Sequence, residues 1–168
     1  MKLCIDVDYR GAVASVGAIG FRKWDDPEGA ENLVFQMQVP SHYQPGEFYR
    51  RELPCLLAAI EAVSCPVEAL IIDGYVWLDG GKPGLGAHLH RSLDEKVPVI
   101  GVAKNPFSQA SDVELVYRGT SKRPLYVSAA GVDLRQAAQT IYRMHGEHRL
   151  PTLLKRVDRL CRDGLSRN

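Results

Sequence analysis

The sequence predicts an α/β fold: a mixed sheet in which three antiparallel strands are followed by parallel strands, with helices on both faces. Two observations carry this prediction. Three strand-like segments open the chain at residues 2–9, 12–21 and 32–39, and helical and strand patterns alternate after them. That order is typical of an α/β protein, whose parallel strand pairs need right-handed crossovers. With 168 residues and 45% hydrophobic composition, the chain can bury one core, and we expect one domain spanning residues 1–168.

The first three segments predict a hairpin and a third strand. Residues 2–9 alternate between apolar and polar side chains, and residues 12–21 are small, apolar and glycine-spaced. Arg10 and Gly11 are expected to form the turn between them. A polar, turn-rich connection separates this hairpin from the strand at residues 32–39.

A long helix is predicted over residues 47–63, where apolar side chains recur at helical spacing. Pro54 is the exception, because proline suits the first helical turn and removes a hydrogen bond further in. We therefore expect the regular helix to begin near Glu52 or to kink there. The chain then continues with a strand at 67–73, a helix at 85–92 and a strand at 97–102.

The last third of the chain predicts a hairpin followed by two helices. Short strand patterns at residues 113–117 and 125–127 flank a turn that contains glycine and proline. A helix over residues 133–144 opens with a capping-box pattern. A basic amphipathic helix over residues 153–162 follows it.

Composition argues against the membrane and secreted classes. The chain has no apolar run of about eighteen residues, and a charge interrupts its apolar N-terminal segment, so neither a membrane span nor a signal peptide is predicted. The four cysteines form no CxxC pair, and Cys4, Cys55 and Cys161 fall on apolar periodic positions, unlike Cys65. This usage is typical of buried reduced thiols. We expect a soluble, cytoplasmic protein.

Charge is distributed unevenly along the chain. Residues 1–117 hold ten Lys/Arg against sixteen Asp/Glu, a balance of −6, whereas residues 118–168 hold eleven against four, a balance of +7. An acidic body with a basic C-terminal third suits a metal-dependent enzyme acting on a polyanion. The alternative is an ordinary solvated basic helix.

Carboxylates mark a candidate site. Asp6 lies at the end of the first strand, Asp73 ends the strand before a glycine-rich loop, and Glu52 lies near the start of the first helix. If the first and fourth strands are neighbours, Asp6 and Asp73 face each other across the cleft at the strand ends. Converging carboxylates repel one another unless a divalent cation lies between them. Asp6, Glu52 and Asp73 therefore predict a Mg²⁺ site, for which Mn²⁺ can substitute.

Such a site suits phosphodiester hydrolysis, because a bound metal polarises the phosphoryl oxygen and lowers the pKa of the attacking water. Lys104, close after the strand at 97–102, can neutralise charge on the phosphate. Each acid also has a structural interpretation, Glu52 as a first-turn helix charge and Asp73 as a turn former.

Six motifs spread over nearly the whole chain occur in a fixed order. They are Asp6-Val-Asp-Tyr9, Tyr43-Gln-Pro-Gly-Glu-Phe-Tyr-Arg-Arg-Glu52, Asp73-Gly74, Gly84-Leu-Gly-Ala-His-Leu89, Gly101-Val-Ala-Lys104 and Arg149-Leu-Pro151. Together they resemble the endonuclease V family, nucleases of the RNase H-like fold that act on deoxyinosine in DNA and, in some members, on inosine in RNA. The resemblance implies an RNase H-like mixed sheet and a repair endonuclease whose partner is DNA or RNA, with no membrane partner, and we expect a monomer.

The resemblance also implies a role for each matching residue. Asp6 and Asp73 would bind Mg²⁺, Glu52 would act through the metal's water shell, and Lys104 would contact the scissile phosphate. The segment containing Tyr43 would enter the duplex as a wedge, while a tight pocket takes the flipped-out base. The residues expected to bind substrate are Tyr43, Pro45, Gly46, Phe48, Arg51, Gly74, Gly84, Leu85, His88, Gly101 and Ala103.

Two departures from the family pattern qualify the expected activity. Family members usually carry Gly-His-Arg before the penultimate helix, with the histidine near the metal, whereas Ala130 stands at that position here. Residues 75–82 also differ from the family's glycine loop. These departures leave open a catalytically weak or inactive nucleic-acid binding module of the same fold. A third hypothesis is a protein of the same fold that acts on a small phosphorylated molecule. The basic C-terminal third argues against it. Asp133 either approaches the metal in the histidine's place or caps its helix.

Overall fold

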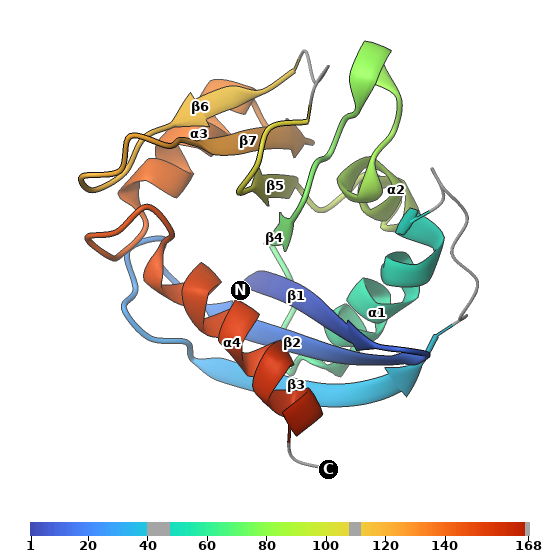
Figure 1. The fold of residues 1–168 in the computed structure, drawn as a ribbon. Helices are drawn as coiled ribbons and strands as arrows, with labels where there is room; N and C mark the ends of the chain where they lie inside the picture. Colours follow the sequence, from blue (N-terminus) through green and yellow to red (C-terminus); the bar gives the residue numbers. More distant parts are fainter. Residues whose placement is uncertain (40–47, 108–111, 167–168) are drawn as a thin grey trace.

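A computed structural model describes residues 1–39, 48–107 and 112–166 of the chain, and it contains a seven-stranded mixed sheet in the order β3-β2-β1-β4-β5-β7-β6 (Figure 1). The predicted α/β fold is confirmed. The strands are β1 Lys2–Arg10, β2 Val13–Phe21, β3 Glu31–Gln38, β4 Ala69–Asp73, β5 Val99–Ala103, β6 Glu114–Val116 and β7 Leu125–Ala130. The helices are α1 Phe48–Ala62, α2 Leu85–Ser92, α3 Leu134–Arg143 and α4 Thr152–Ser166, with a short 3₁₀ turn at Asp79–Gly81.

Strand directions follow the order of the chain. The strands β1, β2 and β3 are antiparallel neighbours, and Gly11 takes a φ of 63° in the turn between the first two, as the hairpin prediction requires. The strand β4 lies parallel to both β1 and β5. The last hairpin, β6 and β7, joins β5 in antiparallel orientation. Two parallel pairs therefore bring the carboxyl ends of β1, β4 and β5 to one edge.

Two apolar cores lie on opposite faces of the sheet. Leu3 and Ile5 of β1 belong to the core that also contains Cys55 of α1 and Leu89 of α2. Cys4 points the other way, into the core with residues of α3 and α4. Because successive strand side chains alternate between faces, this pattern assigns every later residue of β1 and β4 to a face.

The helix α1 lies within the predicted range of residues 47–63, but its regular part begins before Glu52. It starts at Phe48 and runs through Pro54 to Ala62, so the expected start near Glu52 is wrong. Proline removes the helical hydrogen bond to the carbonyl four residues earlier, that of Arg50. Arg50 is exposed, so water can reach that carbonyl, and the remaining turns bury Cys55, Leu56 and Ala59.

Two expectations from composition, on the cysteines and on membrane-spanning segments, can be compared with the structure. Cys4, Cys55 and Cys161 are buried free thiols, as predicted, and Cys65 is exposed. Within the described ranges, none of the helices combines the length and apolar character needed to cross a bilayer.

Candidate metal centre

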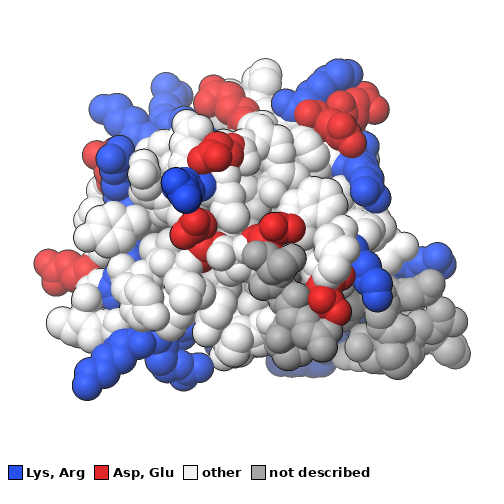
Figure 2. All heavy atoms as spheres, turned by 90° about the horizontal axis from the view of Figure 1, so that it is seen from above, with Lys and Arg blue, Asp and Glu red and all other residues white. Residues whose placement is uncertain are grey.

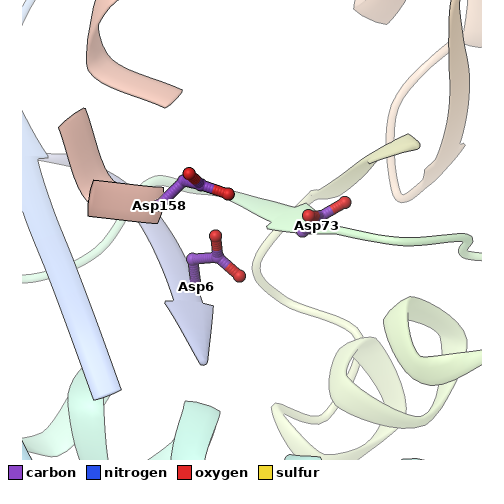
Figure 3. A group of neighbouring side chains, drawn as sticks. All are labelled: Asp6, Asp73 and Asp158. Carbon is purple, nitrogen blue, oxygen red and sulfur yellow. The ribbon is translucent and has the colours of Figure 1, made fainter. Parts of the chain in front are cut away.

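Three aspartates converge at the edge where β1 and β4 end. Asp6 stands two residues after Cys4, and Asp73 two residues after Ile71, so both point to the face covered by α4. Asp158 approaches them from α4 itself. One carboxylate oxygen from each lies within 4.8 Å of the others, and Figure 3 shows the three side chains grouped at this edge of the sheet.

Asp158 is absent from the predicted set. In the sequence it is one acid within a basic helical segment, which gives no hint of which distant strands it will meet. A partial signal exists, because Leu154 and Val157 form the buried stripe of α4 and residue 158 follows at helical spacing from Leu154. That spacing places Asp158 at the rim of the buried face, close to Asp6.

Lys104 balances part of the negative charge. Its Nζ donates to Asp73 Oδ2 at 2.8 Å and to Asp158 Oδ1 at 2.9 Å. Burial alone would lower the pKa of Lys104, but the hydrogen bonds and charges of the two aspartates raise it, so the side chain stays protonated. The guanidinium of Arg149 donates to the Lys104 carbonyl and to that of Pro124, which fixes the backbone from which the lysine projects.

The remaining acids are costly to ionise together. Burial and the charge of Asp73 raise the pKa of Asp6 to about 7, although Lys104 opposes the shift. Glu52 is 7% exposed, and its burial, together with the charges of Asp6 and then Asp73, raises its pKa to about 8. The structure thus brings Glu52 within electrostatic reach of the aspartates, but not into the group of three converging carboxylates.

This donor set fits a hard divalent cation. Carboxylate oxygens are the ligands that Mg²⁺ and Mn²⁺ prefer, and Mg²⁺ usually takes one or two of them together with waters and a phosphate oxygen. Asp6, Asp73 and Asp158 could hold the ion, and Glu52, which interacts electrostatically with Asp6 and Asp73, could meet the ion's water shell. A cation there would favour the ionised form of Asp6, whose pKa is raised in its absence.

The predicted substrate-binding residues have different surroundings. Tyr43, Pro45 and Gly46 lie outside the described residues, and Phe48 is the first residue of α1. Arg51 stacks over the Tyr9 ring at 4.3 Å and donates to the Gly11 carbonyl, so it braces the first hairpin.

His88 and Leu85 both lie on α2. His88 stacks on Tyr49, with ring centroids 3.6 Å apart and an interplanar angle of 6°. Leu85 packs against the core shared with α1. Ala103 is buried at the end of β5. Contacts within the chain therefore occupy Arg51, His88 and Leu85.

Three of the predicted pocket glycines, those within the described residues, gather around one loop. Gly74 has a φ of 123°, and a side chain there would meet open space. A Cβ at Gly101 would lie 2.5 Å from the Gly74 carbonyl oxygen, and one at Gly84 would lie 2.7 Å from the carbonyl oxygen of Tyr75. Gly84 and Gly101 thus permit close packing of the loop after β4, and of these three described glycines only Gly74 faces open space.

That loop, which departs from the family pattern, is tied to its neighbours by side chains. The Trp77 indole N–H donates to the Ala129 carbonyl at 2.9 Å, and the Val76 N–H donates to the hydroxyl of buried Ser128. The Tyr75 hydroxyl donates to the Asn105 carbonyl at 2.7 Å and accepts from the amide of Phe107. The loop therefore anchors the segment that follows Lys104.

Ala130, where the family histidine was expected, does not belong to this centre. It pairs with Val99 at the start of β5 and is buried in the core of the α1 and α2 face. The aspartates lie on the other face, so a side chain at position 130 cannot complete their cluster. Asp133 is not a substitute either, because its carboxylate accepts from the Gln136 amide and caps α3.

Charge on the surface is segregated. One face of the molecule has acidic side chains near its middle, while most of its lysines and arginines lie toward the margins (Figure 2). A polyanion approaching this face meets cations around an acidic centre.

Comparisons with known proteins agree with these features. The sequence model of endonuclease V matches residues 3–159. Endonuclease V of Streptomyces avermitilis is 31% identical over 148 residues, covering 76% of this chain, and the chain spans only 64% of that protein's length. A crystal structure of the Streptomyces avermitilis enzyme has a TM-score of 0.79 at 26% identity, covering 98% of this chain and 81% of that one.

A second solved structure shares the fold. Endonuclease V of Ciona intestinalis, in complex with a 24mer DNA containing an inosine followed by a ribo-adenosine, has a TM-score of 0.75 at 16% identity. The match covers 98% of this chain and 86% of that one. Since the family's sequence model covers residues 3–159, the chain belongs to the endonuclease V family.

Proposed function

We propose that this protein is a divalent-metal-dependent endonuclease that hydrolyses a phosphodiester near deoxyinosine, inosine or a distorted base in nucleic acid. The observation that carries the proposal is the convergence of Asp6, Asp73 and Asp158 beside Lys104. Family membership supports it, as does the complex of the Ciona intestinalis relative with inosine-containing DNA.

Each residue of the centre has a role in this proposal. Asp6, Asp73 and Asp158 would hold Mg²⁺, which when bound polarises the phosphoryl oxygen and lowers the pKa of the attacking water. Lys104 would exchange a carboxylate partner for the phosphate and neutralise charge that develops there. Glu52 would accept and orient hydrogen bonds from water beside the three aspartates.

The alternative, a binding module without catalysis, rests on the absence of the family histidine. The structure weakens this argument, because position 130 lies on the opposite face of the sheet and Asp158 supplies the third carboxylate of the centre. We retain the binding module only as an outcome of the test below.

The test is a cleavage assay with Mg²⁺ or Mn²⁺ on a deoxyinosine duplex, an inosine-containing RNA and their unmodified counterparts. The protein should cut a modified strand, and Asp73→Asn should abolish the cut. Asp79→Asn, a change to another acid six residues along the same loop, serves as the matched control and should keep the activity. Cleavage no greater than that of the Asp73→Asn variant would contradict the proposal, and tight binding without cleavage would identify the binding module.

A further inference from the structure

A groove runs along α4 beside the metal centre. It has a volume of about 750 Å³, with α4 forming one wall and the loop from His145 to His148 the other. Leu150 lines both this groove and the small cavity that holds Asp6, Asp73 and Lys104. Asp158, which lines the groove, accepts a hydrogen bond from Lys104 of that cavity. The groove is therefore continuous with the centre.

Cationic side chains follow the groove at helical spacing. Lys155, Arg159 and Arg162 are separated by four and three residues, which places them on one face of α4 around Asp158. All three are exposed. Arg156 also lines the groove, and the acids that line it besides Asp158 are Glu147 and Asp163.

Asp158 does not cancel this positive charge. Its carboxylate already accepts hydrogen bonds from Lys104 and Arg162, at 2.9 and 2.8 Å, and points toward the other aspartates. Lys155, Arg156 and Arg159 are the other exposed cations that line the groove.

The facing wall is held in place by a buried arginine. Arg118 is 4% exposed and donates to a series of backbone carbonyls around the loop, those of Tyr142, Met144, Gly146, His148 and Arg149. The loop also closes onto α4, because the Thr152 amide donates to the His145 carbonyl at 2.8 Å. Since both walls are fixed in the free protein, a ligand entering the groove pays little ordering entropy.

We infer that this groove binds the phosphodiester backbone of the nucleic-acid substrate on one side of the cut. The inference rests on the proposed function, since it assumes that the centre acts on a nucleic acid. Lys155 and Arg162 are about 10 Å apart along the helix axis, roughly the length of three nucleotides of a strand in B-form DNA. A strand leaving the metal centre past Asp158 would thus meet successive cations, whereas a single phosphate would use only one.

The test compares two charge reversals of equal size. The double variant Lys155→Glu/Arg159→Glu changes the groove, and Arg135→Glu/Arg143→Glu changes two exposed arginines of α3 by the same net charge. Fluorescence anisotropy with a labelled deoxyinosine duplex in EDTA measures binding without cleavage. At about 100 mM KCl the groove variant should bind at least ten-fold more weakly, and its plot of log affinity against log salt should lose about two units of slope, one per phosphate contact. The α3 variant should show smaller changes in both.

A truncated substrate locates the strand. Duplexes shortened on either side of the deoxyinosine should erase the difference between the native protein and the groove variant on one side only. Equal binding by the two double variants would overturn the inference, as would an absence of binding by the native protein. If the native protein binds through the groove but never cuts, the proposed function fails while the groove stands; if it cuts and the groove variant binds normally, only the groove inference fails.

Discussion

Asp158 is the residue that most changes the description of the centre. It supplies one of three carboxylate oxygens that lie within 4.8 Å of one another. Asp158→Asn should weaken Mn²⁺ binding at least ten-fold in isothermal titration calorimetry, because the site loses one formal charge and an anionic ligand oxygen. Asp163→Asn, an exposed acid on the same helix, is the control and should leave the affinity unchanged. Equal affinities for the two variants would remove Asp158 from the metal centre.

The contrast between Asp73 and Asp158 shows what the sequence can reveal at this scale. A strand has a period of two and parallel strands share a direction, so the ends of β1 and β4 could be brought together from the sequence alone. Asp158 lies on a helix that packs on the sheet from far along the chain. Its position depends on the packing of α4, which no local pattern specifies.

At the scale of elements, Arg118 anchors the loop between α3 and α4. Arg118→Ala would leave buried carbonyls of the 144–149 loop without their donor, and each unsatisfied group costs about 1–3 kcal/mol. We expect the free energy of unfolding to fall by about 2–4 kcal/mol, measured by urea denaturation at constant m-value. Arg135→Ala, whose side chain is 86% exposed, should change it little. A comparable loss in both variants would argue against this role for Arg118.

Most elements were predictable because their patterns are local. The capping box places α3, and the strand periods place β1 to β5, each within a few residues. The expectation that the regular part of α1 begins near Glu52 is wrong. Burial of the apolar face of this helix outweighs the low helix propensity of Pro54. The conformation of the loop after β4 could not be predicted either, because Val76 and Trp77 meet their hydrogen-bond partners, Ser128 and Ala129, only in the folded sheet.

At the scale of the whole molecule, the acidic and basic parts of the sequence lie next to each other in space. The cations of α4 lie beside the acids of β1 and β4, so the acidic body and the basic C-terminal third share one continuous site. When no cation is bound, the ionised carboxylates of this site repel one another. This repulsion should lower the free energy of unfolding of the whole protein.

Stability of the metal-free protein should therefore fall as pH rises. Carboxyls of the unfolded chain ionise near pH 4, whereas folding raises the pKa of Asp6 to about 7 and of Glu52 to about 8. Between about pH 4 and 8 the folded state retains protons that the unfolded state has released, so deprotonation favours unfolding, and the free energy of unfolding falls by up to about 1.4 kcal/mol per group for each pH unit in that window. The measurement is urea denaturation in EDTA across this range.

Glu52→Gln separates this effect from a general response to pH. The variant should be more stable than the native protein near pH 8 and should show a shallower decline, because the buried amide has no charge to desolvate. Glu61→Gln, on the exposed side of the same helix, should keep the native slope. Added Mn²⁺ should stabilise the native protein most at high pH, where the carboxylates it binds are ionised. Parallel pH profiles for the two glutamate variants would show that the buried carboxyl of Glu52 does not carry the raised pKa, and the destabilisation would then have to come from Asp6 alone.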